Sequence, residues 1–261
     1  MKRQGFLRLL LACIAVTAAQ AQVPVNASKP SAASEVDLRP GFEQWKLPPK
    51  KQGARNTCSV MTTVGAMEYA LAKKLNRGIP LSAEYLNWAC NKIINNSTED
   101  RGQFFHDLVK GYELYGVCTE AEMPYATNFM PGYQPSARAT NDAGVIHSYG
   151  LRPHWLKPYD GKTGVSDDHL EQIRATLRKG WPVCAGSFHS VLFVGYKDAA
   201  SLEGGGGFYV RDSGEGKQGI MSYKEARERL CDLLWFDTEE PKTNRSPDIR
   251  GGLRAITKGT E

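Results

Sequence analysis

The sequence lacks a strong charge imbalance, an internal repeat and a long low-complexity run. A formal net charge of +5 over 261 residues, with no basic stripe interleaved with aromatics, argues against a nucleic-acid partner. The five histidines lie at no metal-ligand spacing, so neither a metal nor another cofactor is expected. Hydrophobic residues make up 41% and charged residues 23%, as in ordinary globular proteins, and the length allows one large core or two modest ones.

The sequence also lacks an apolar run long enough to span a membrane. The short apolar run at residues 9–16 follows Lys2 and Arg3 and precedes the small-residue sequence at 19–21. A positive start, a short apolar stretch and a small-residue cleavage site are the parts of a secretory signal peptide. We therefore expect residues 1–21 to be removed, which leaves a secreted or periplasmic chain with no stable membrane association.

Lipidation is an alternative at the same end of the chain, because Leu10-Leu11-Ala12-Cys13 faintly resembles a bacterial lipoprotein box. A mature N-terminus at Cys13, seen by mass measurement, would favour this alternative over cleavage after Ala21. Cleavage after Ala21 removes three cationic residues, so the formal charge falls from +5 to about +2.

Cysteine is scarce, with six in the chain, and Cys13 leaves with the signal. The five that remain are Cys58, Cys90, Cys118, Cys184 and Cys231. Export places the chain in an oxidising compartment, and an odd number of cysteines leaves one free thiol. Sequence neighbourhood favours the bridges Cys90–Cys118 and Cys184–Cys231, with Cys58 free. The alternative is four reduced, buried thiols that pack as small apolar residues.

Composition divides the chain into an ordered region and two polar ends. Residues 22–36, rich in Ser, Ala and Pro, are expected to form a flexible lead-in, and residues 238–261 a loose polar tail. The ordered region is expected to span residues 37–237. Only this short lead-in separates the ordered region from the signal.

The hydrophobic period changes along the ordered region. The pattern predicts helices at 57–76, 82–89, 104–115 and 167–179, and strands at 181–187, 190–196, 208–211 and 233–236. Helices first and strands later indicate an α+β fold, with a helical lobe over about 50–140 and a sheet lobe over about 141–237. A cleft between two such lobes is a common place for a ligand site.

Four residues have the properties that acyl transfer through a thioester requires. Cys58 stands in the first turn of the helix predicted at 57–76, and a helix N-terminus favours the nucleophilic thiolate. His189 opens an apolar strand and is the candidate acid–base group, and Asp212 closes another strand and is the candidate orienting group. Gln52 is the candidate donor to a developing oxyanion, together with the backbone N–H of Cys58.

Each of these residues also has an ordinary structural interpretation. Cys58 could be a buried or bridged cysteine, Asp212 a turn residue before Ser213-Gly214, and Gln52 a solvated glutamine in a turn. The remaining four histidines are expected to have surface or core roles. The joint occurrence of a nucleophile, a base, an orienting group and an oxyanion donor favours the catalytic interpretation.

The order Cys, His, Asp and the 131 residues between Cys58 and His189 resemble the papain-like cysteine peptidases. Further segments resemble family motifs and follow the family's order: Val36-Asp37-Leu38-Arg39, Leu81 to Leu86 with Cys90, Gly116 to Tyr125, and His189 to Tyr196. The resemblance implies a helical N-terminal lobe, an antiparallel β-barrel or sheet C-terminal lobe and an active-site cleft between them. It also implies a peptide or protein substrate and catalytic roles for Cys58, His189, Asp212 and Gln52.

The sequence departs from the family pattern around the nucleophile and the base. Ser59 replaces the tryptophan after the nucleophile, and Arg55 replaces the disulfide cysteine just before it. Gly214 replaces the tryptophan that ordinarily covers the hydrogen bond between the histidine and its orienting residue, so that bond is expected to be more hydrated here. The stretch from Val183 to His189 is much shorter than in the family, so a different specificity pocket is expected.

The leading hypothesis is an exported thiol peptidase that hydrolyses peptide bonds through a thioester at Cys58. A thiol acyltransferase or transamidase would use the same residues but pass the acyl group to an amine. A non-catalytic binding module on the same fold is the third hypothesis, because the missing tryptophans and the altered pocket change the site. It predicts a Cys58 thiol of ordinary reactivity.

Overall fold

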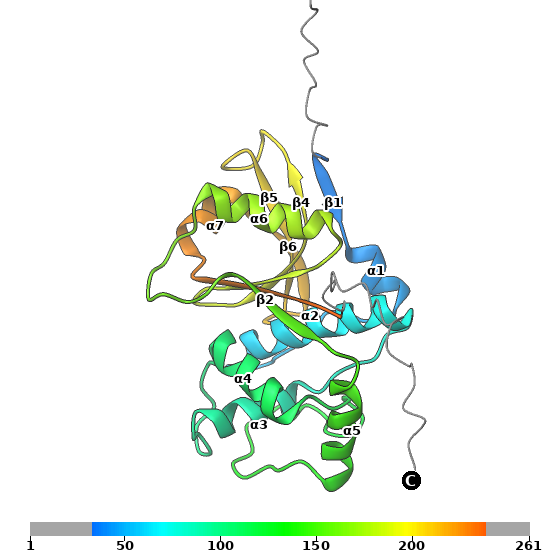
Figure 1. The fold of residues 1–261 in the computed structure, drawn as a ribbon. Helices are drawn as coiled ribbons and strands as arrows, with labels where there is room; N and C mark the ends of the chain where they lie inside the picture. Colours follow the sequence, from blue (N-terminus) through cyan, green and yellow to red (C-terminus); the bar gives the residue numbers. More distant parts are fainter. Residues whose placement is uncertain (1–32, 239–261) are drawn as a thin grey trace, which may run out of the picture. The chain divides into compact units, whose positions relative to one another are not determined.

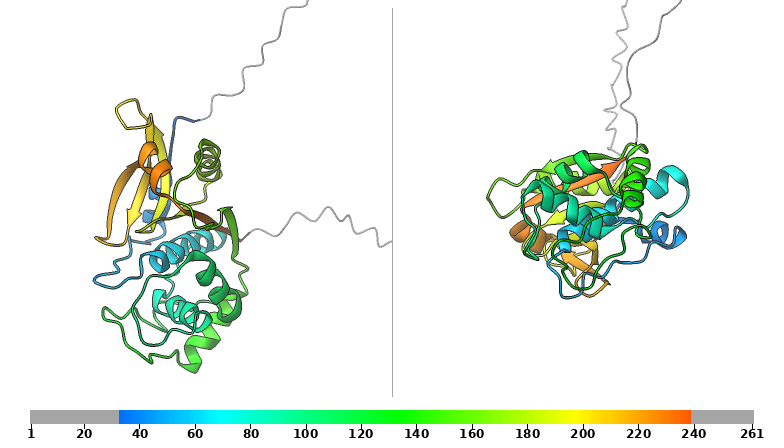
Figure 2. Two further views of the ribbon diagram at one scale, coloured as in Figure 1. Left: turned by 90° about the vertical axis from the view of Figure 1, so that its left-hand side faces the viewer. Right: turned by 90° about the horizontal axis from the view of Figure 1, so that it is seen from below.

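Helix α2 (Cys58–Leu75) is the centre of the computed structural model, with a sheet on one side and a group of shorter helices on the other (Figure 1). Figure 2 shows the same arrangement of the sheet, α2 and the helices α3 to α5 from a second direction. The structure describes residues 33–238, and the expected signal peptide, most of the lead-in and the tail lie outside them.

The elements follow the order expected from the sequence, helices mainly before strands. The helices are α1 (Arg39–Gln44), α2 (Cys58–Leu75), α3 (Ala83–Ile93), α4 (Phe105–Tyr115), α5 (Ala137–His147), α6 (Asp167–Arg178) and α7 (Tyr223–Arg229). The strands are β1 (Glu35–Asp37), β2 (Arg152–Lys157), β3 (Val183–Gly186), β4 (Val191–Asp198), β5 (Gly206–Asp212), β6 (Lys217–Ser222) and β7 (Asp232–Asp237). The predicted α+β class is confirmed. None of the helices within residues 33–238 has the length and hydropathy needed to cross a membrane.

Helix α2 is buried along most of its length because it packs on two sides. It contacts β3, β4 and β7 on one side and α3 and α4 on the other. Val60, Val64 and Met67, which recur at helical spacing, are all fully buried. Asn76, in the left-handed conformation (φ 51°), ends the helix where the sequence predicted. The packing on both sides fixes the position of Cys58 at the start of α2.

All the strands within residues 33–238 join one antiparallel sheet, whose main order is β2-β7-β3-β4-β5-β6. Strand β3 pairs with the first half of β4, and β1 pairs with its second half. Strand β4 is buried on both faces: Leu192 and Val194 join the core around α2, and Val191 and Phe193 join a second core with α6 and α7. Burial on both faces explains why β4 is a continuous apolar run instead of an alternating one.

Some elements were not predicted from the sequence. The segment 153–164, rich in turn formers, begins with most of the edge strand β2, where Pro153 is tolerated because an edge strand can lack one N–H. The helix α5 and the pair β6–α7 were also missed. Helix α7 begins at Ser222, whose Oγ accepts a hydrogen bond from the backbone N–H of Glu225 at 3.1 Å.

The predicted disulfides Cys90–Cys118 and Cys184–Cys231 are wrong, since all five cysteines of the described residues have free thiols. Cys90 packs in the core around α2, whereas Cys118 belongs to a separate cluster. In the sheet, Cys184 lies opposite Leu234, three positions along the chain from Cys231. Different clusters and a mismatched register keep the expected partners apart.

Candidate active site

The candidate base and its orienting group come from neighbouring strands. His189 lies in the tight connection at residues 187–190 between β3 and β4, and Asp212 is the last residue of β5. Because β4 and β5 pair with Leu192 opposite Arg211, both residues emerge at the same end of the sheet. His189 Nε2 and Asp212 Oδ1 are hydrogen-bonded at 2.7 Å.

The third residue, Cys58, reaches this pair from the start of α2. Its side chain is hydrogen-bonded to His189. Burial raises the pKa of the Cys58 thiol, but the hydrogen bond to His189 and the backbone N–H groups of Ser190 and Ser59 lower it, and the net pKa lies below the ordinary value. The structure therefore brings together three residues that are far apart in the sequence. His189 lies 131 residues after Cys58, and Asp212 lies 154 residues after it.

The imidazole of His189 is shifted in the opposite direction. The hydrogen bond to Cys58 is the largest cause and raises the pKa of His189 to about 9 against the effect of burial, and Asp212 adds to the rise. The lowered thiol pKa and the raised imidazole pKa both favour transfer of the proton from Cys58 to His189. This transfer produces a thiolate–imidazolium pair, the state in which cysteine is a nucleophile.

The hydrogen bond between His189 and Asp212 is open to solvent, with the two side chains 38% and 36% exposed. Gly214 stands beside the pair, and a Cβ there would lie 3.5 Å from His189 Cε1. The sequence-based expectation of a more hydrated bond agrees with this geometry, because glycine leaves the pair uncovered. The backbone N–H of Gly214 also donates to Asp212 Oδ1 at 2.7 Å and so fixes the carboxylate.

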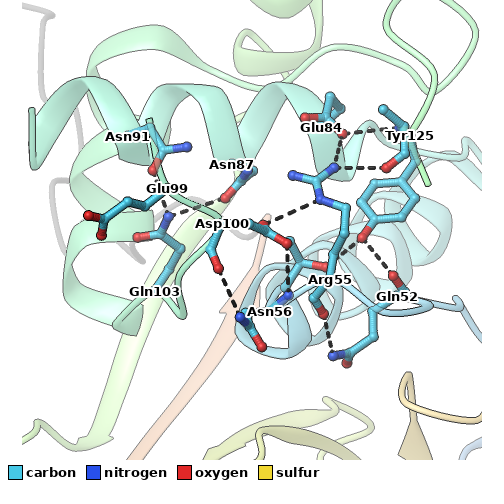
Figure 3. A network of polar contacts seen from close by, with 12 residues as sticks. Gln52, Arg55, Asn56, Glu84, Asn87, Asn91, Glu99, Asp100, Gln103 and Tyr125 are labelled. Carbon is cyan, nitrogen blue, oxygen red and sulfur yellow. Dashed lines mark hydrogen bonds and ion pairs between the residues drawn. The ribbon is translucent and has the colours of Figure 1, made fainter. Parts of the chain in front are cut away.

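The side-chain amide of Gln52 is held in one orientation. Its Oε1 accepts a hydrogen bond from Ser213 Oγ at 2.8 Å. Its Nε2 donates to the backbone oxygen of Arg55 at 2.7 Å (Figure 3). A carbonyl oxygen can only accept, so the amide nitrogen must stay on the Arg55 side. One Nε2 proton remains for a further acceptor, which is what an oxyanion donor requires.

No protein-family model and no curated protein match the sequence, whereas solved structures do match the fold. The crystal structure of xylellain, a cysteine protease from Xylella fastidiosa, has a TM-score of 0.62 at 21% identity and covers 80% of this chain and 88% of its own. Procathepsin L 3 of Tenebrio molitor gives 0.57 at 18% identity, with 83% and 73% covered. The ragweed cysteine protease Amb a 11, in its proform, gives 0.55 at 18% identity, with 82% and 69% covered. The chain has the papain-like fold.

In this papain-like fold, a buried cation stands where the sequence resemblance places a disulfide cysteine. Arg55 is 2% exposed, and its Nη1 lies 2.5 Å from Glu84 Oε2 on α3 and 2.9 Å from the backbone oxygen of Ala126. Its Nε lies 3.4 Å from Asp100, whose carboxylate also accepts from the backbone N–H of Asn56 (Figure 3). Arg55 therefore joins the loop before the nucleophile to three other segments of the helical half.

A second contact holds the same loop at both ends. The hydroxyl of Tyr125 donates to the backbone oxygen of Gln52 at 2.9 Å and lies 2.7 Å from Thr57 Oγ1, next to the nucleophile (Figure 3). Sequence reasoning noted Arg55 as a departure from the family but missed this network. Its partners lie 29 to 71 residues away, and no local pattern indicates them.

A cavity of about 210 Å³ opens beside Cys58 in this papain-like fold. It is lined from the helical half by residues 102–105, from the connection at 187–190, and from the start of β7. A larger and more open cavity of about 760 Å³ holds His189 and Asp212 and shares Phe188 with the first. The short connection leaves Phe188 fully exposed, and this residue lines both cavities.

The remaining four histidines do not line either cavity. His169, for example, completes a capping box with Ser166 at the start of α6. Within residues 33–238, no group of three or more His, Cys, Asp or Glu side chains could hold a metal ion.

Proposed function

We propose that this chain is an exported cysteine peptidase that hydrolyses peptide bonds through a thioester on Cys58. The observation that carries the proposal is the contrast between Cys58 and the other thiols of the chain. Burial raises the pKa of Cys90 and of Cys118 to about 12, as expected of thiols that serve packing alone, whereas the pKa of Cys58 is lowered. A lowered thiol pKa beside an oriented imidazolium supports nucleophilic catalysis over a passive binding role.

In the proposed reaction the Cys58 sulfur attacks the substrate carbonyl carbon, and the carbonyl oxygen becomes an oxyanion. The backbone N–H of Cys58, which has no acceptor within its own helix, and the remaining Nε2 proton of Gln52 stabilise this charge. His189 gives its proton to the leaving amine, which leaves a thioester. It then takes a proton from water, the water attacks the thioester, and the acid product departs as thiolate and imidazolium are restored.

Export is part of the same proposal and rests on the composition of residues 1–21, which lie outside the described residues. A chain that starts at Gln22 is therefore the form to test. The experiment is digestion of a peptide mixture by this form under reducing conditions, with new N-termini read by mass spectrometry. Cleavage that disappears when Cys58 is alkylated supports the proposal, and a preparation that is readily alkylated at Cys58 but cleaves no peptide contradicts it.

Substitution of Asp212 separates its charge from its hydrogen bond. In Asp212→Asn the amide oxygen still accepts from His189 but the charge is gone, so the pKa of His189 falls and the alkaline limb of the kcat/KM profile moves below about pH 9. Asp212→Ala removes both the charge and the hydrogen bond. His189→Ala is expected to lower kcat/KM by about 10²–10⁴-fold, and Asp212→Ala by less. A pH profile of kcat/KM for each variant measures both effects.

The matched control is Glu215→Gln, which removes a neighbouring carboxylate that is 69% exposed and pairs with the exposed Lys217. Its pH profile should equal that of the unchanged chain. If Asp212→Asn left the alkaline limb in place, or if Asp212→Ala cost as much as His189→Ala, the orienting role would be refuted.

A further inference from the structure

An acidic side chain, that of Asp232, lines the cavity beside Cys58. Asp232 is the first residue of β7 and lies opposite Gly186, the last residue of β3. Its carboxylate lies over Gly186 and fills the space that a Cβ at that position would need. Because the connection that carries His189 begins directly after Gly186, the pairing of β3 with β7 places this carboxylate close to the nucleophile.

The carboxylate of Asp232 is buried without a cationic partner. The residue is 5% exposed and lines the cavity, and within residues 33–238 its carboxylate accepts only from its own backbone N–H. Lys157 acts on it at longer range but donates its hydrogen bonds to Asp160 at 2.9 Å and to the backbone oxygen of Cys231 at 2.7 Å. A buried carboxylate that faces an open cavity with no partner favours a cation from outside.

The charges around the cavity leave an excess of negative charge. Lys157 on β2 is offset by its own partner Asp160. Cys184 on β3 and Cys231 before β7 are uncharged thiols at neutral pH, because burial raises the pKa of each. Cys58, which also lines the cavity, has His189 as its own partner. Asp232 is therefore the charge that remains for a ligand.

Four aromatic side chains also line the cavity: Phe104, Phe105, Tyr159 and Phe188. The rings of Phe104 and Tyr159 lie 5.1 Å apart between centroids, and both residues are exposed at the rim, as is Phe188. Aromatic faces accept an alkyl stem and attract a cation, and the carboxylate of Asp232 completes the pairing. An aliphatic side chain would desolvate the carboxylate without replacing its lost water.

We propose that this cavity selects substrates with a lysine or arginine side chain, which pairs with Asp232 while the acyl group reacts at Cys58. The choice of substrate rests on the proposed peptidase function, whereas the cation-binding property of the cavity does not. Burial raises the pKa of Asp232 to about 6, so the preference should be full above this pH and should fade below it as the carboxyl group becomes neutral.

The first test is a peptide library that varies one position at a time, digested by the unchanged chain and by Asp232→Asn. We expect the unchanged chain to favour lysine or arginine over leucine at one position by about tenfold or more, and Asp232→Asn to lose this ratio. Glu215→Gln, which removes a 69% exposed carboxylate that lines the neighbouring cavity, should keep it. A preference for aliphatic residues, or an unchanged ratio in Asp232→Asn, would overturn the proposal.

The second test needs no turnover. Cys58 is labelled with a cationic aminoethyl methanethiosulfonate and with a neutral ethyl methanethiosulfonate, and the two rates are read by peptide mass spectrometry. The ratio of cationic to neutral rates should fall at least about fivefold in Asp232→Asn and should also fall below about pH 6 in the unchanged chain. A ratio that responds to neither change refutes the acidic cavity even if peptides are cleaved. A ratio that responds in a chain that cleaves nothing supports the cavity and refutes the peptidase.

Discussion

Cys58→Ala is expected to lower kcat/KM for peptide hydrolysis by about 10⁴–10⁶-fold. The substitution removes the atom that forms the thioester, so neither acylation nor deacylation can occur through the chain. Cys58 is only partly buried and has no bridge, so the melting temperature should change by no more than a few degrees. Steady-state hydrolysis and a thermal melt on the same preparation measure the two quantities.

Cys118→Ala is the matched control, because Cys118 is a free, buried thiol in a cluster away from the cleft. We expect it to lose some stability and to retain activity, the opposite of Cys58→Ala. Two results would refute the catalytic role of Cys58. One is an activity of Cys58→Ala within a hundredfold of the unchanged chain. The other is a large loss of stability in Cys58→Ala, such that unfolding of the variant accounts for its lower activity.

Arg55→Ala is expected to lower the free energy of unfolding by about 3–5 kcal/mol, the largest stability change among these predictions. The cost comes from Glu84, which is 4% exposed and would be left as a buried charge without its cation. The loop before Cys58 would also lose its tie to α3, so kcat/KM should fall as well. Urea denaturation followed by fluorescence gives the free energy, and the assay above gives the activity.

Arg138→Ala is the control for a surface ion pair. Arg138 lies 2.8 Å from Glu122 but is 83% exposed, so its loss should cost less than about 1 kcal/mol. If Arg55→Ala cost no more than Arg138→Ala, the ion-pair network would not be the element that holds the nucleophile loop. Addition of Glu84→Gln to Arg55→Ala should recover part of the lost stability, because it removes the unpaired charge.

The elements that the sequence revealed are those with a strong local pattern. The helix that begins at Cys58 has a repeating apolar face, and the strand after His189 is a continuous apolar run, so both could be placed from their own residues. Cys58, His189 and Asp212 could be predicted as site residues because they stand at the ends of such elements. Their roles remain predictions that the variants above test.

The features that the sequence did not reveal depend on pairings across the fold. The expected disulfides failed because nearness in sequence placed Cys90 with Cys118, although they pack in separate clusters. Asp232 was overlooked because its position at the cavity is set by the register of β7 against β3. The partners of Arg55 were hidden for the same reason, since a surface pair and a buried pair look alike in sequence.

The measurement that tests the central claim most directly is the alkylation rate of Cys58 by iodoacetamide as a function of pH, read by peptide mass spectrometry. Cys231 serves as a reference thiol in the same digest, because it is partly exposed and its pKa is raised by burial. A thiolate held by His189 predicts rapid labelling of Cys58 that persists below about pH 6 and is lost in His189→Ala. Labelling of Cys58 that rises only near about pH 8.5, as for an ordinary thiol, would contradict the ion pair and favour a non-catalytic binding module.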